Sequence, residues 1–142
     1  MCIADYYISH NVMGRDQAIQ QALIFYVAES RTGKRPITTP AEVEGYLREA
    51  LVKEQCRRYN YVLDNVGGSV DALNFHFYED YNALSIVTDF LRLRAQKIGI
   101  PVRMVTNEIG QRGPDVAYAE GDDQAKAVFK KMVMANVVGL EA

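Results

Sequence analysis

The sequence predicts an α/β protein in which a β-α-β-α unit follows two or more helices, and three observations support this fold class. The apolar residues have helical spacing up to about residue 66, and they change to strict alternation over residues 70–78. A second alternating stretch covers residues 102–109, and a helical pattern separates the two stretches. Strand, helix, strand and helix joined by short connections are typical of a parallel sheet with right-handed crossovers.

Length and charge restrict the classes of protein to be considered. The chain has 142 residues with 49% hydrophobic content, and one ordinary domain of that size buries roughly two-thirds of its unfolded surface. Its 16 basic and 18 acidic residues leave a net charge of only -2, so we expect neither nucleic acid nor a membrane as a partner. No apolar run approaches the ~20 residues that span a bilayer, and the first residues do not resemble a signal peptide. We expect a soluble protein of unknown compartment.

The candidate metal ligands and thiols point to no cofactor. Cys2 and Cys56 are too few and too far apart in the sequence for a disulfide framework or a metal knuckle, so free thiols are expected. The acidic residues of the second half lack the spacing of a calcium-binding loop. These residues are Glu79, Asp80, Glu120, Asp122 and Asp123. The sequence therefore predicts neither a metal nor a cofactor.

The first half of the chain is expected to be helical. Residues 15–30 carry apolar side chains at helical spacing, and Gly33 is placed to end that helix. Residues 39–42, Thr-Pro-Ala-Glu, form a capping box with proline at the first helical position. A long helix should start there and continue to Gly67, with a polar break at residues 53–55 that can divide it in two.

The first alternating stretch has two faces of different polarity. Leu73, Phe75 and Phe77 are large and apolar, which suits packing under helices. The other face becomes more polar toward the C-terminal end of the strand and carries Ala72, Asn74, His76 and Tyr78. Such a gradient fits a sheet face that opens into a site, because α/β enzymes place their chemistry at the C-terminal ends of parallel strands.

The remaining elements follow from caps and alternation. Asn82 is placed to cap a helix that Gly99 ends, and Asp122 or Asp123 is placed to cap a last helix that ends near Gly139. Between these two helices, alternation assigns one face of the second strand to Val102, Met104, Thr106 and Glu108.

Glu108 carries the candidate chemistry. Corresponding positions on neighbouring strands lie about 4.8 Å apart, so His76 or Tyr78 is expected beside Glu108. A carboxylate that accepts a hydrogen bond from a tyrosine hydroxyl near a histidine stays ionised and oriented. This arrangement suits the nucleophile of retaining glycoside hydrolysis, in which a second carboxylic acid about 5 Å away protonates the leaving oxygen. No second acid is evident in the sequence.

Two segments resemble a known family. Residues 71–80, Asp-Ala-Leu-Asn-Phe-His-Phe-Tyr-Glu-Asp, resemble strand six of the TIM-barrel glycoside hydrolases related to cellulases, mannanases and xylosidases, in which histidine and tyrosine line the site. Residues 100–110, Ile-Pro-Val-Arg-Met-Val-Thr-Asn-Glu-Ile-Gly, are similar to strand seven, whose Asn-Glu-x-Gly ending presents the nucleophile at the position of Glu108. Gln124-Ala125 and Gly139 fit the helix that follows in this family.

The resemblance covers roughly residues 63–142 and implies a partial (β/α)8 TIM barrel. Residues 39–142 would form the glycoside hydrolase-like domain, and residues 1–38 an unassigned N-terminal helical segment. Glu108 would be the catalytic nucleophile. The carbohydrate substrate would be bound by Asn74, His76, Tyr78 and Asn107. Because an eight-stranded barrel needs about 250 residues, we expect a fragment or truncated family member that is inactive alone.

The sequence also allows other interpretations of Glu108, of His76 and of the whole chain. Asn107-Glu108 also resembles the acid/base signature on strand four of the same enzymes, and without the motif Glu108 is a strand-end carboxylate that caps a loop. His76 is then a hydrogen-bonded core histidine. The whole chain can instead be a small non-catalytic α/β domain that binds carbohydrate or self-associates, because two strands leave an unpaired edge. A homo-oligomer would bury the apolar residues expected on the Glu108 face, which are Ala72, Val102 and Met104.

Overall fold

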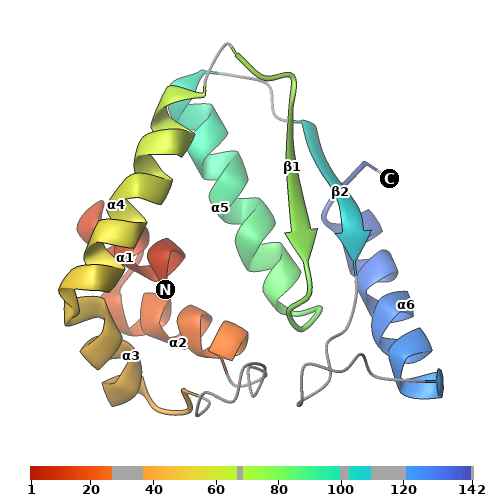
Figure 1. Ribbon diagram of the computed structural model, residues 1–142, viewed down its shortest axis with the longest axis horizontal. Helices are drawn as coiled ribbons and strands as arrows, with labels where there is room; N and C mark the ends of the chain where they lie inside the picture. Colours follow the sequence, from red (N-terminus) through yellow and green to blue (C-terminus); the bar gives the residue numbers. More distant parts are fainter. Residues whose placement is uncertain (27–36, 67–68, 100–102, 110–120, 142) are drawn as a thin grey trace.

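The computed structural model describes residues 1–26, 37–66, 69–99, 103–109 and 121–141 (Figure 1). Its elements are α1 (Cys2–Ser9), α2 (Arg15–Tyr26), α3 (Pro40–Arg48), α4 (Ala50–Asn65), β1 (Ala72–Phe77), α5 (Ala83–Ile98), β2 (Arg103–Ile109) and α6 (Gly121–Val137). The predicted β-α-β-α unit after two or more helices is confirmed. In the described part of the chain, β1 and β2 form a two-stranded parallel sheet and no closed barrel.

Local signals account for several helix ends. The Thr39 hydroxyl accepts a hydrogen bond from the amide of Glu42, and the Glu42 carboxylate accepts one from the amide of Thr39, so the predicted capping box starts α3. Gly99 ends α5 in the left-handed conformation with φ of 72°, as its sequence position predicted. Asn82 precedes α5, but its side chain binds Asp80 instead of capping the helix.

The bounds of several other helices differ from the predicted ones. The long helix predicted from residue 39 does divide, but at Glu49, whose extended backbone separates α3 from α4, and not at residues 53–55. α1 was not predicted from the sequence. α6 begins at Gly121, so Asp122 and Asp123 lie in its first turn and do not precede it. The predicted end of the second helix at Gly33 lies outside the described residues.

The core lies where the N-terminal helices meet α5. Figure 1 shows α5 between helices α1–α4 and the sheet. Phe90 of α5 is fully buried, and its ring lies 5.4 Å from that of Tyr6 and 5.8 Å from that of Tyr7, both edge-on. On its other side α5 packs under the apolar face of the sheet, where Phe77 is buried with Leu84. α5 therefore joins the helical half of the molecule to the strands.

A disulfide bond connects α1 to α4. Cys2 and Cys56 are bonded, with 4.8 Å between their Cα atoms. The expectation of free thiols was wrong, because distance in the sequence does not limit contact between packed helices. The side chain of Cys56 is fully buried, whereas Cys2 is partly accessible.

The two strands pair with one irregularity. Leu73 faces Met104 and Asn74 faces Val105, but the next pair is His76 with Glu108. Between the last two pairs β1 advances by two residues and β2 by three. The irregularity is a β-bulge whose extra residue lies on β2. Side chains after the bulge change faces relative to regular alternation.

Because of the bulge, the residues of β2 do not all lie on the predicted faces. Alternation assigned Met104 to the face of Glu108, but Met104 pairs with Leu73 and is buried with the helices, only 3% exposed. Glu108 lies on the opposite face with His76. Met104 therefore needs no second chain to cover it, and the predicted self-association through Met104 loses its basis. Val102 lies outside the described residues.

The chain returns to the sheet at its C-terminal end. Gly139 has φ of 68°, which reverses the chain after α6. Glu141 then forms a parallel bridge with Val105, and its amide donates a hydrogen bond to the carbonyl of Met104 at 2.9 Å. Residue 141 thus occupies the position of a third parallel strand next to β2.

Candidate functional site

The candidate site is a histidine–carboxylate pair at the C-terminal ends of β1 and β2. Nδ1 of His76 lies 3.0 Å from Oε2 of Glu108. The two side chains are 54% and 49% exposed, so the pair is open to solvent. The bulge in β2 brings them together, because an unbroken register from Asn74 and Val105 would place Asn107 opposite His76.

The apolar face of the sheet holds the pair in place. Phe77, next to His76, is 1% exposed and packs with Leu84 of α5, while Ile109, next to Glu108, contacts the same cluster. Because neighbouring side chains alternate across a strand, packing of Phe77 and Ile109 on the helix side directs His76 and Glu108 to the open face. The sequence predicted this face correctly for β1.

The other residues predicted to bind substrate have different positions. Asn74 is exposed on the open face of β1, two residues before His76. Asn107 is exposed within the bulge. Tyr78 lies one residue beyond the end of β1 and is partly buried, so strand alternation no longer determines its direction. The roles of these three residues stay predictions.

Glu79 is the acidic residue nearest to His76 in the sequence. Its carboxylate folds back and accepts a hydrogen bond from the amide of Tyr78 at 3.1 Å. The next acid, Asp80, accepts hydrogen bonds from the amide and the side chain of Asn82 in the turn before α5. Residues 110–120, which follow β2, lie outside the described part of the chain.

An ion pair missed by the sequence analysis lies at the other end of the strands. Arg103 Nε is 3.0 Å from both carboxylate oxygens of Glu141, and Arg103 shares the open face with His76 through its pairing with Ala72. The hydrogen bonds from Arg103 lower the pKa of the Glu141 carboxyl, and those same bonds raise the pKa of Arg103. The two residues are 38 positions apart, so no local pattern could indicate the pair.

The described residues form neither a metal site nor a membrane-spanning helix. No three side chains of His, Cys, Asp or Glu are grouped so that they would hold a metal ion. No helix in the described ranges is long and apolar enough to cross a membrane.

Comparison with known proteins assigns the chain to no family. No family model, no curated protein and no solved structure matches this chain.

Proposed function

We propose that this chain is a piece of a (β/α)8-barrel glycoside hydrolase domain in which Glu108 occupies the position of the nucleophile. The observation that supports the proposal most is the His76–Glu108 pair, 3.0 Å apart at the C-terminal ends of adjacent parallel strands. Barrel enzymes place their catalytic side chains at that end of the strands. Polar side chains on one face and packed apolar side chains on the other agree with a barrel interior and its outer helices.

The path of the chain after β2 supports the same proposal. α6 packs against α5 and contributes Met134 and Ala135 to the cluster around Phe77. Glu141 then forms a single parallel bridge to Val105 of β2, at the place where a next parallel strand would pair. Adding each new parallel strand beside the previous one, with its helix on the outer face, is the construction rule of a (β/α)8 barrel.

The proposed chemistry assigns one step to this chain. The Glu108 carboxylate attacks the anomeric carbon, the bond to the leaving oxygen breaks, and a glycosyl ester forms on Glu108. His76 orients the carboxylate through Nδ1, and Asn74 and Asn107 are proposed to bind sugar hydroxyls. An ordinary leaving group needs a proton from a second carboxylic acid about 5 Å away. We propose that this acid belongs to a part of the barrel that precedes this piece.

A leaving group that needs no proton tests this step alone. We expect a 2,4-dinitrophenyl 2-deoxy-2-fluoro-β-glycoside to label the chain slowly at Glu108, detected as one added glycosyl mass by mass spectrometry and located by peptide mapping. Glu108→Gln should abolish labelling, whereas Glu54→Gln, which removes an exposed carboxylate on α4, should not. Hydrolysis of unactivated glycosides should be at least 10²-fold slower than in a complete enzyme, because the acid is missing.

Two results would contradict this proposal. Labelling that persists in Glu108→Gln would place the nucleophile elsewhere. Rapid turnover of unactivated glycosides by the isolated chain, abolished by Glu108→Gln, would show that the chain holds a complete site and is not a piece of one.

Self-association is the second candidate, and one surface favours it. α6 exposes an apolar stripe at helical spacing, with Phe129 67%, Val133 48% and Val137 72% exposed. We propose that a second copy packs its α6 against this stripe across a two-fold axis, because a self-complementary helix face closes a dimer. The oligomer then involves α6 and not the Glu108 face.

Light scattering at micromolar concentration measures this association. The expected result is a dimer that Val133→Glu converts to a monomer, because a charge would be buried in the helix interface. Val62→Glu, the same substitution at an exposed valine of α4, is the matched control and should leave the dimer intact. A monomeric wild-type chain would exclude self-association as the function of this surface.

A further inference from the structure

The two cysteines of the disulfide differ in accessibility. Cys56 of α4 is 0% exposed, whereas Cys2, the first residue of α1, is partly accessible. Thiol–disulfide exchange begins when a thiolate attacks one of the two sulfur atoms, so access to each sulfur decides which of them reacts. In the folded chain Cys2 is therefore the residue of this pair that a thiol approaches.

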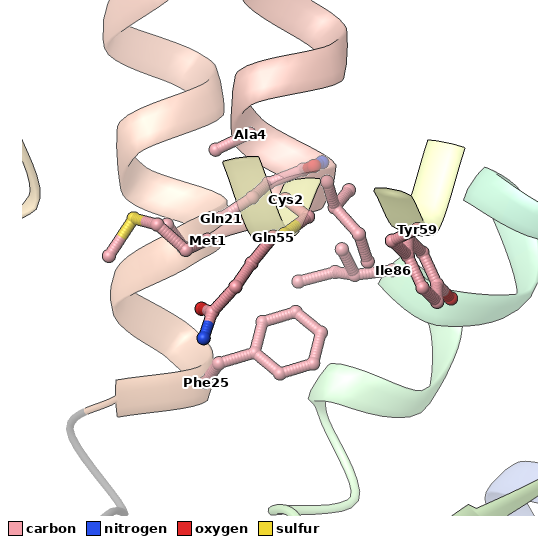
Figure 2. Close-up of a pocket in the computed structure, with 10 residues that line it drawn as sticks. Met1, Cys2, Ala4, Gln21, Phe25, Gln55, Tyr59 and Ile86 are labelled. Carbon is pink, nitrogen blue, oxygen red and sulfur yellow. The ribbon is translucent and has the colours of Figure 1, made fainter. Parts of the chain in front are cut away.

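A cavity of about 400 Å³ adjoins the accessible side of the disulfide. Among the described residues Cys2 lines this cavity and Cys56 does not. Figure 2 shows Cys2 among the side chains around this space, with Gln55 of α4 and Ile86 of α5. The volume lies within the range of about 300–1,000 Å³ typical of small-molecule sites. The cavity therefore offers space for a small thiol beside Cys2.

Other contacts hold α1 in place when the covalent bond opens. The Tyr6 ring packs edge-on against Phe90 of α5 with 5.4 Å between the ring centres, and the Arg94 guanidinium lies 4.2 Å from the centre of the Tyr6 ring. Tyr7 packs against Phe90 as well. Because these contacts do not involve the disulfide, we expect the chain to stay folded after exchange, with the Cys56 thiol still buried. A buried structural thiol is inert, so further modification is confined to Cys2.

We propose that Cys2 is a site of reversible S-thiolation by a thiol of low molecular weight. The thiolate attacks Sγ of Cys2 and forms a new S–S bond, while the bond to Cys56 breaks and the Cys56 sulfur leaves with the electron pair and takes up a proton. Attack of the Cys56 thiolate on Sγ of Cys2 expels the added thiol and restores the disulfide. The modification thus replaces the covalent link between α1 and α4 by an adduct on α1. It does not depend on the glycosidase proposal.

Glutathione added to the oxidised full chain tests which sulfur reacts. We expect one mixed disulfide per folded chain, on Cys2 at least about tenfold more often than on Cys56, because access decides which sulfur is attacked. An acid quench, peptic digestion at acid pH and peptide mapping by mass spectrometry locate the adduct without further exchange. The same chain in denaturant is the matched control. It should carry the adduct on both cysteines in similar amounts, since unfolding exposes both sulfur atoms.

Two single variants measure the accessibility of each thiol separately, and they are matched because both lack the same disulfide. With glutathione disulfide as the reagent, folded Cys56→Ala should form a mixed disulfide and expel one glutathione at least about tenfold faster than folded Cys2→Ala, because a buried thiol is inert.

Three results would overturn the proposal. The folded wild-type chain forms no adduct under conditions in which the denatured chain forms it, its adduct lies on Cys56 as often as on Cys2, or the two folded variants react equally fast. The first two results use the wild-type chain and do not depend on how the variants fold.

Discussion

Reduction of the Cys2–Cys56 disulfide is expected to lower the free energy of unfolding by about 4 kcal/mol. The bond closes a loop between residues 54 positions apart, so it removes many conformations from the unfolded chain. The expected loss is a large part of the 5–15 kcal/mol typical of a domain. It should be larger than the effect of removing any surface ion pair of this chain, because such pairs contribute about 0–1 kcal/mol each.

Denaturant unfolding with and without reductant measures this loss. The variant with both Cys2→Ala and Cys56→Ala should match the reduced protein, and reductant should have no effect on it. Titration of the native oxidised chain with a thiol reagent should detect no free thiol. Two reactive thiols in the native protein, or equal stability with and without reductant, would show that the disulfide does not form in solution.

Replacement of Arg94 by alanine is expected to destabilise the fold by about 3–5 kcal/mol. Arg94 lies on α5 and is only 1% exposed. Its guanidinium donates hydrogen bonds to the side chain and the carbonyl of Asn60, pairs with Asp64, and lies 4.2 Å from the centre of the Tyr6 ring. Alanine would leave these partners unpaired and a gap between α1, α4 and α5.

Two further variants make the Arg94 experiment specific. Arg58→Ala on α4 removes an exposed arginine from Glu54, which keeps its pairing with Arg57, and should cost less than 0.5 kcal/mol. Arg94→Lys should recover only part of the loss, because an ammonium cannot replace the planar guanidinium that contacts Asn60, Asp64 and Tyr6 together. An Arg94→Ala protein as stable as Arg58→Ala would mean that the buried contacts contribute no net stability.

The disulfide and Arg94 affect the candidate site indirectly. The disulfide joins α1 to α4, and Arg94 of α5 binds α4 by hydrogen bonds. α5 in turn connects β1 to β2 and supports the buried side of the sheet through Leu84. Loss of either contact is therefore expected to loosen the strands that hold His76 and Glu108.

The elements that were predicted correctly depend on local interactions. The capping box at Thr39 and the end of α5 at Gly99 depend on contacts within a few residues, so the order of amino acids is enough to predict them. The apolar face of β1 was predicted for the same reason, because strand alternation requires no knowledge of the partner. The order of β1, α5, β2 and α6 followed from these elements and from short connections.

Features that involve residues far apart in the chain became visible in the folded structure and not in local sequence patterns. The disulfide and the ion pair of Arg103 with Glu141 join residues 54 and 38 positions apart. The bulge between Asn74 and His76 exists only in the pairing of two strands. It places Glu108 opposite His76, on the other face from the buried Met104. The cavity lined by residues of α1, α2, α4 and α5 likewise needs four packed helices (Figure 2). Local periodicity predicts which face a residue occupies, but the free energy of packing and strand pairing sets the register that decides its neighbours.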